Sequence, residues 1–159
     1  MNICKLLSIA MLPLFASQAT AETALTIIGK DASRAEMVIQ YSMDDLKALD
    51  QTNFTTINNF VEAPVLYSGP LLREVIAPLT LSEDAALELT GLDGYHLEIP
   101  LTDAMNYDVI VAIEMNGAPM SIRDSGPLWI MYPISDHPEL QDHLYNSRMV
   151  WLLTEVKVK

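Results

Sequence analysis

Two oppositely charged side chains, Arg123 and Asp124, stand next to each other in the loop between Met120 and Gly126. The loop follows an Asn116-Gly117 pair, a strong signal for a tight hairpin turn because both turn residues need positive φ. It precedes an apolar run, Leu128 to Tyr132, that reads as a buried strand. A cation beside a carboxylate at such a place suits a small-molecule or anion site. An exposed ion pair without a ligand would give the same pattern.

Aromatic residues surround this loop and the second candidate cation, Arg148. They are Trp129, Tyr132, Tyr145 and Trp151. Aromatic walls beside a cation are typical of small-ligand clefts, so Arg123, Arg148 and Tyr132 form the first candidate ligand-binding set. The two tryptophans are equally suited to anchor neighbouring strands in the core.

The three histidines offer a weaker candidate. His137 and His143 are six positions apart, whereas a spacing of three or four would place both imidazoles on one helical face. Together with Asp136 and Asp142 they could form a metal site, but solvated polar positions explain them as well. No nucleophile elbow, phosphate loop or dinucleotide fingerprint is present, so no catalytic residue and no metal ligand is assigned.

The charge balance excludes several partners. The chain carries 9 basic and 21 acidic residues, a formal net charge of −12, and no basic stripe. Nucleic-acid backbones and anionic membrane surfaces both need clustered Lys and Arg. The acidity therefore serves solubility or suits a basic partner.

The N-terminus has the pattern of a secretory signal peptide, residues 1–21. Lys5 precedes an apolar run, Leu6 to Ala16, and Ala19-Thr20-Ala21 gives a small-x-small cleavage site. The run is shorter than the roughly 20 residues that span a bilayer, and a retained anchor is the alternative. We expect one domain, residues 22–159, in the periplasm. Cys4 is the only cysteine, so that domain has no disulfide and no thiolate site.

Short β-rich runs alternate with short helical segments, which predicts an α+β fold with a mainly antiparallel or mixed sheet. The predicted strands are 24–28, 36–41, 54–57, 65–67, 85–89, 95–99, 109–115, 128–132, 149–153 and 155–158. Ser42, Ser68-Gly69-Pro70, Thr102 and Pro138 are predicted to begin helices. In the last of these, Leu140 and Leu144 are expected to form a buried edge.

Several motifs occur in an order that resembles a known family. They are Tyr67-Ser68-Gly69-Pro70-Leu71-Leu72, Leu92-Asp93-Gly94-Tyr95, Met115-Asn116-Gly117-Ala118-Pro119-Met120, Gly126-Pro127-Leu128 and Ser147-Arg148-Met149-Val150-Trp151-Leu152. The sequence from about Leu25 to Val158 resembles the oxidoreductase molybdopterin-binding domain, which has the sulfite-oxidase fold. The likeness is greatest to its small, exported, single-domain bacterial members.

The resemblance implies a place for a metal-ligating cysteine. In catalytic members one cysteine, at the end of the strand after the first helix, holds the metal together with the pterin dithiolene. The corresponding stretch here contains Asn58 and Asn59 and no cysteine. A neutral amide does not replace a thiolate as a soft ligand. The resemblance also places Arg148 near the family's phosphate-binding residues.

The sequence therefore predicts a non-catalytic module that keeps the fold without the metal chemistry. Its ligand-binding residues would be Arg123, Arg148, Tyr132, Asn58 and Asn59. Its partner would be a small molecule or the periplasmic domain of a membrane receptor, without a bound cofactor. The alternative is a molybdopterin-dependent oxidoreductase, or a redox partner subunit of one, that binds molybdopterin as the family does.

Overall fold

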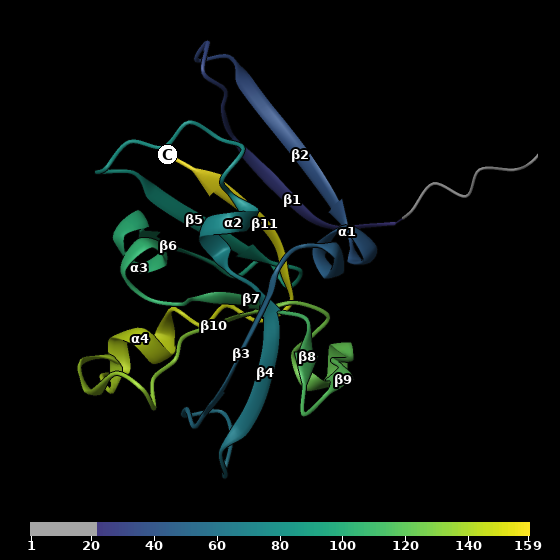
Figure 1. Ribbon diagram of the computed structural model, residues 1–159, viewed down its shortest axis with the longest axis vertical. Coiled ribbons are helices and arrows are strands. Elements are labelled where there is room, and N and C mark those ends of the chain that lie inside the picture. The colour runs from purple at the N-terminus through teal and green to yellow at the C-terminus, as the bar shows by residue number, and fades with distance from the viewer. Residues whose placement is uncertain (1–21) are drawn as a thin grey trace, which may run out of the picture.

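A computed structural model describes residues 22–159, and the predicted signal peptide lies outside this range. The largest sheet has five strands, in the order β2-β1-β11-β5-β6 (Figure 1). Their bounds are β1 Thr23–Lys30, β2 Glu36–Ser42, β5 Ala86–Gly91, β6 His96–Pro100 and β11 Leu153–Val158. β1 and β11 are parallel and the other neighbours are antiparallel. Alternate residues of β1 and β5, such as Leu25 and Leu87, are fully buried.

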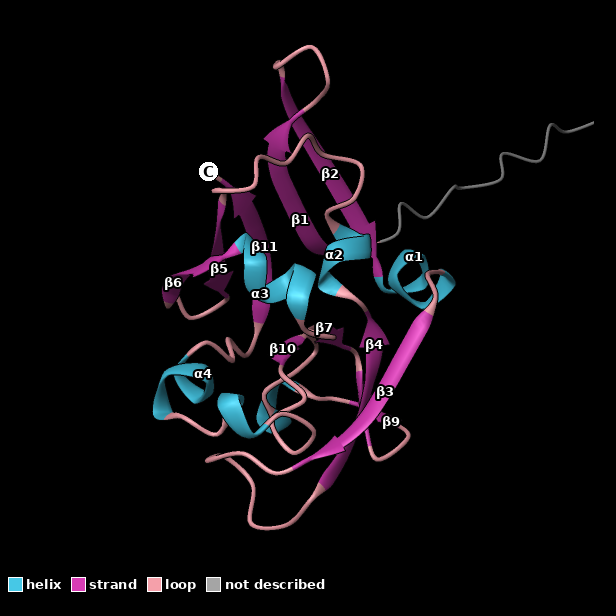
Figure 2. Ribbon diagram, turned by 60° about the vertical axis from the view of Figure 1, so that its left-hand side comes forward, coloured by secondary structure: helices cyan, strands magenta, loops and turns pink. Residues whose placement is uncertain are grey.

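A four-stranded antiparallel sheet, β3-β4-β8-β9, extends away from the first sheet (Figure 2). Its strands are β3 Gln51–Thr56, β4 Val65–Pro70, β8 Glu114–Met115 and β9 Ala118–Pro119. Asn116 and Gly117 have φ values of 52° and 77°, which confirms the predicted tight turn between β8 and β9.

A buried two-stranded sheet lies between these two. It contains β7 (Ile110–Ala112) and β10 (Trp129–Met131), and all of their residues are buried. Gly69 of β4 packs directly on β7, since a Cβ at this position would lie 2.0 Å from the Val111 carbonyl oxygen. Only glycine fits this contact, which joins the four-stranded sheet to the core.

The helices are short and cover the sheets at their ends. They are α1 Met43–Ala48, α2 Leu72–Val75, α3 Leu101–Asn106, η1 Ile122–Asp124, η2 Pro138–Leu140 and α4 His143–Ser147. Ser42 caps α1 in a reciprocal capping box with Asp45, as its sequence predicts. The α+β class with mixed and antiparallel sheets is confirmed. No helix within residues 22–159 is long and apolar enough to cross a membrane.

Two helix starts, one buried helix edge and one strand differ from the prediction, whereas the predicted helix start at Pro138 is confirmed by η2. Residues Ser68 to Pro70 stay in β4, because they pair with Gln51 to Asn53 of β3, and α2 begins only at Leu72. Thr102 caps no helix, since α3 already begins at Leu101.

Leu144 is 51% exposed instead of buried, because η2 ends at Leu140 and α4 begins anew at His143, so no continuous helical face joins the two leucines. The predicted strand 149–153 is also wrong. The chain there approaches β10 with single hydrogen bonds, such as Ile130 N to Val150 O at 2.9 Å, and β11 begins only at Leu153.

Candidate functional site

The loop that follows β3 forms one wall of a pocket of about 360 Å³. The other wall comes from the segment after β10 and from η2 and α4, about 80 residues further along the chain. The lining residues are Ile57, Asn58, Asn59, Ile134, Ser135, Gln141 and Asn146. All the polar side chains among them are neutral amides or a hydroxyl, and two isoleucines supply the apolar part.

Hydrogen bonds hold the two walls together. The Ile57 amide donates to Ser135 Oγ at 3.2 Å, and the Ser135 amide donates to Thr56 Oγ1 at 3.1 Å. The Asn59 amide donates to Asn146 Oδ1 at 2.9 Å. Because these bonds join backbone to side chains across the pocket, its shape is built into the fold.

Asn58 is the most unusual residue of the pocket. Its Oδ1 accepts a hydrogen bond from the Phe60 amide at 2.8 Å, which is the turn role expected of asparagine. Its Nδ2 is buried and has no partner, and neither has the buried Tyr67 hydroxyl. Burial raises the pKa of Tyr67 and the facing Asn58 side chain opposes that rise, yet the two groups do not reach hydrogen-bond geometry. Buried donors without partners are rare, and they often mark functional positions.

Asn59 is exposed and reaches toward α4. Its Nδ2 lies 3.4 Å from Nδ1 of His143, for which the sequence offers a metal-ligand role or a solvated polar position. His137 instead lies against Glu139 and the Tyr107 ring. The two histidines therefore contact different partners. Within residues 22–159 no group of three or more His, Cys, Asp or Glu side chains is placed to hold a metal ion.

Arg148 and Tyr132 do not line the pocket; both bind Asp103. The Arg148 Nη1 donates to Asp103 Oδ2 at 2.6 Å, and the Tyr132 hydroxyl donates to the same oxygen at 2.8 Å. The Arg148 guanidinium also covers the Tyr145 ring, 5.1 Å from its centroid. Burial, and then the Asp103 charge, raise the pKa of Tyr132. The Asp103 carboxylate therefore neutralises Arg148, the cation that the sequence predicts to bind a ligand.

Sequence reasoning missed Asp103. The signal that could have found it is its place in α3, a helix that also buries Leu101 and Ala104. An acidic residue on the apolar face of a helix needs a buried cation or donor.

Arg123 lies on η1, exposed and away from the pocket lining. The alternative interpretation, an ion pair with Asp124, is also wrong, because Asp124 Oδ2 accepts from Ser121 Oγ at 2.6 Å. None of the ion pairs among residues 22–159 includes Arg123. The structure therefore brings Asn58 and Asn59 together in one pocket but separates them from Arg123.

The aromatic residues form a chain of ring contacts next to the pocket. Trp129 is buried and its Nε1 donates to the Met149 carbonyl, so its role as a core anchor is confirmed. The exposed Phe60 ring packs on Trp129 and on Trp151, with centroid distances of 5.8 and 5.2 Å. The neighbour of Asn59 thus packs on the hydrophobic core, which fixes the loop that carries both asparagines.

Comparison with known proteins identifies the fold and the family. No curated protein matches this chain. Among solved structures, the sulfane dehydrogenase SoxCD from Paracoccus pantotrophus is similar, with a TM-score of 0.61 and 14% identity over 88% of this chain. The chain spans only 39% of that protein's length, so the likeness shows the fold alone. A model of the family described as oxidoreductase molybdopterin binding domain matches residues 16–135. The protein therefore belongs to the oxidoreductase molybdopterin binding domain family.

Proposed function

We propose that this protein is an exported, non-catalytic member of its family that binds a small ligand in the Asn58 pocket. One observation carries the proposal: Nδ2 of Asn58 is a buried donor without a partner, beside a pocket that the fold holds open. It lies in the stretch where the family resemblance implies a cysteine. The amide stands where a thiolate would be needed for metal chemistry.

The residues around the pocket do not fit a thiolate-bound molybdenum centre. The lining offers amides, one hydroxyl and aliphatic groups, and none of these is a soft, charged ligand for a high-valent metal. A pterin phosphate would need a free cation. Arg148 is bound to Asp103, and neither Arg148 nor Arg123 lines the pocket. We therefore derive no catalytic step through the metal.

The same lining suits a neutral ligand with donors and acceptors along its edge. Asn58, Asn59 and Gln141 supply side-chain amides to the lining, and Ile57 and Ile134 provide apolar contact. A volume of about 360 Å³ is at the small end of ligand pockets and accommodates a bicyclic ring. The family's description makes a pterin ring the first ligand class to test.

The decisive experiment is an analysis of protein purified from its native host. We expect molybdenum far below one equivalent by mass spectrometry. A pterin added without metal should bind reversibly. Asn58→Ala should weaken that binding by about tenfold, as expected when a buried hydrogen bond is lost. Asn53→Ala, which changes an exposed asparagine of β3, is the matched control. Stoichiometric molybdenum with pterin would overturn the proposal.

The second candidate function is a molybdopterin-dependent oxidoreductase or a redox partner subunit of one. Family membership favours it, and the same metal analysis decides between the two.

Export is a separate part of the proposal. It predicts that the protein recovered from the periplasmic fraction begins at Glu22, which N-terminal sequencing would test. A protein that retains residue 1 and remains with the membrane would contradict it.

A ligand-bound form could also act on a partner protein, and the periplasmic domain of a membrane receptor is the kind of partner we propose. The expected result is a ligand-dependent complex between the purified protein and such a domain. A complex whose affinity is the same for the wild type and for Asn58→Ala, with ligand present, would show that the pocket does not control it.

A further inference from the structure

A second concave surface is lined by residues from the start of β1, which lies on the opposite side of the molecule from α4 (Figure 1). This groove has a volume of about 370 Å³ and shares no lining residue with that pocket. Its apolar lining consists of Ala24, Met43, Leu92, Ile122, Pro127 and Leu153.

Two of these residues are unusually exposed for large apolar side chains. Leu92 is 62% and Ile122 is 64% exposed, and they come from different loops. Backbone hydrogen bonds join those loops through Leu152, whose carbonyl accepts from Leu92 at 2.8 Å and whose amide donates to Ser125 at 3.0 Å. Leu152 itself has a φ of 51°, a left-handed conformation that costs a branched residue free energy. The groove is therefore preformed, and its two exposed side chains are held at one place.

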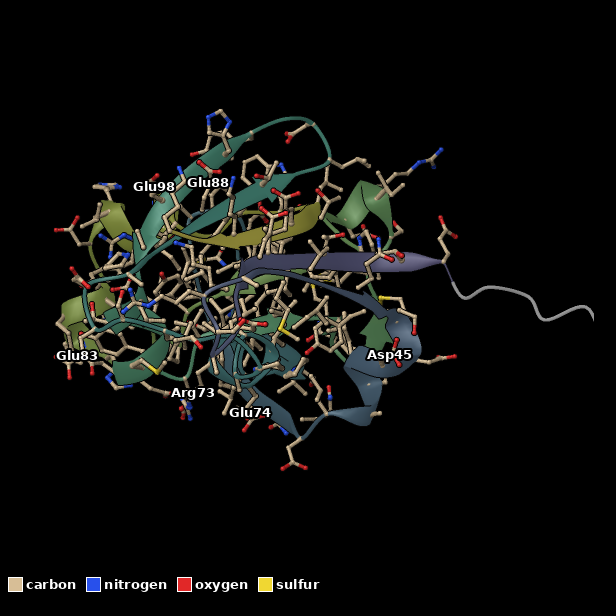
Figure 3. All side chains as sticks on the ribbon, turned by 90° about the horizontal axis from the view of Figure 1, so that it is seen from above. Asp45, Arg73, Glu74, Glu83, Glu88 and Glu98 are labelled. Atoms are coloured by element: carbon tan, nitrogen blue, oxygen red, sulfur yellow. The ribbon has the colours of Figure 1, made fainter. Side chains whose placement is uncertain are left out.

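The chain segments that form the groove are strongly acidic, and Glu22 itself lines it; these acidic residues are called its rim below. Six acidic residues and one basic residue lie in the lining or within two positions of it, compared with 21 and 9 in the whole chain. They are Glu22, Asp44, Asp45, Asp93, Asp124 and Glu155, with Arg123 as the basic one. Figure 3 shows Asp45 at the end of the molecule where the described chain begins. The Ser42 hydroxyl lowers the pKa of Asp45, so this carboxylate stays ionised over the physiological range.

From this arrangement we propose that the groove docks a basic segment of a protein partner, with aliphatic side chains in the groove and Lys or Arg on the rim. An apolar patch surrounded by charges of mainly one sign is typical of a protein interface. The proposal does not depend on the ligand of the Asn58 pocket, because the two surfaces share no residue.

The rim charge also decides against the other occupants. A second copy would bring two acidic rims together, and like charges at that distance repel. An anionic membrane or a nucleic acid would be repelled in the same way. A basic segment is the only one of these that satisfies both the apolar lining and the rim.

The test uses the full protein and a fluorescent 12-residue peptide with four Leu and four Lys, followed by anisotropy. Two matched peptides replace Lys by Glu or Leu by Ser. We expect saturable binding of the Leu-Lys peptide, no binding of the Glu peptide and at least tenfold weaker binding of the Ser peptide. Raising the salt from about 50 to about 300 mM should weaken binding several-fold, because rim charges are screened.

Protein variants locate the site. Leu92→Ser and Ile122→Ser should each weaken binding by about tenfold, because each removes most of one buried aliphatic contact. Val38→Ser is the matched control, since Val38 is 53% exposed and belongs to β2, an edge strand of the five-stranded sheet that does not line the groove. The pair Asp44→Asn and Glu155→Gln tests the rim and should weaken binding about threefold, whereas Glu36→Gln should leave it unchanged.

Equal binding by the Ile122→Ser and Val38→Ser variants would overturn the proposal. Equal binding of the Leu-Lys peptide and the Ser peptide would also overturn it, because it would indicate charge attraction alone. Sedimentation that shows a dimer dissociated by Ile122→Ser would overturn it in favour of a second copy. Unchanged thermal unfolding of each variant confirms that lost binding reflects the surface and not the fold.

Discussion

Two buried polar clusters of this protein differ in how far their hydrogen bonds are satisfied. In the cluster of Asp103, Tyr132 and Arg148, one carboxylate oxygen accepts from both a phenol and a guanidinium. In the cluster of Asn58 and Tyr67, an amide nitrogen and a phenol oxygen are buried without partners. An unsatisfied buried donor costs about 1–3 kcal/mol, so the second cluster is a stability loss that the first does not have.

This difference separates a structural role from a binding role. Arg148 had the residue type expected of an anion-binding site, but its pairing with Asp103 fixes α4 against α3 and leaves no free charge. Asn58 had the residue type of an ordinary turn, but its unpartnered nitrogen lies beside a pocket. Hydrogen-bond satisfaction, more than residue type, indicates which cluster is available to a ligand.

The largest expected effect comes from removing the shared acceptor of the satisfied cluster. Asp103→Ala should destabilise the protein by about 3 kcal/mol, because it leaves a largely buried guanidinium and a buried phenol unpaired. Urea unfolding measures the change. Asp108→Ala, which removes the exposed partner of Arg73, is the control and should cost less than about 1 kcal/mol. Equal losses for the two variants would remove the distinction between the clusters.

A smaller loss is expected at the phenol of the same cluster. Tyr132→Phe removes one hydrogen bond to a charged acceptor and should cost about 1.5–3 kcal/mol, while the ring and its packing stay. The free energy of unfolding in urea is again the measurement. A cost below about 0.5 kcal/mol would mean that Arg148 alone satisfies Asp103.

Alkaline pH tests the same phenol without changing its packing. Burial, followed by Asp103, raises the pKa of Tyr132 above its unfolded value near 10, so the folded state retains a proton that the unfolded state loses. Stability from this group is therefore complete below about pH 10 and declines as pH rises further, by up to about 1.4 kcal/mol per pH unit. Tyr132→Phe should flatten the decline between pH 10 and 11. A slope unchanged by the variant would contradict the prediction.

The sequence predicted the fold better than the site, for a physical reason. Periodicity and turn chemistry are local, so the β1–β2 hairpin, the Ser42 cap and the Asn116-Gly117 turn were all predicted correctly. Helix starts failed where a strand partner decided the outcome, as at Ser68 to Pro70, which β3 retains in the sheet.

The site depends on contacts between residues far apart in the chain. Asn59 and Asn146 are 87 positions apart, and Arg148 and Asp103 are 45 apart. No local pattern reports such pairs. The family resemblance points to Asn58 and Asn59 and also to Arg148, whereas Arg123 is predicted from residue type and from its position in a loop. Of these residues only Asn58 and Asn59 line the pocket, because Asp103, which no local pattern connects to Arg148, binds that arginine.

The smallest expected effect is also the one that contrasts most with Tyr132. Tyr67→Phe makes the same chemical change in the unsatisfied cluster, where the hydroxyl has no partner to lose. Its stability change in urea should lie between zero and a gain of about 1 kcal/mol, because a buried group without a hydrogen bond is removed. A loss as large as that of Tyr132→Phe would mean that the Tyr67 hydroxyl is satisfied in solution. In that case the contrast between the clusters would depend on Asn58 Nδ2 alone, and ligand binding by Asn58→Ala would become the sole measurement that distinguishes them.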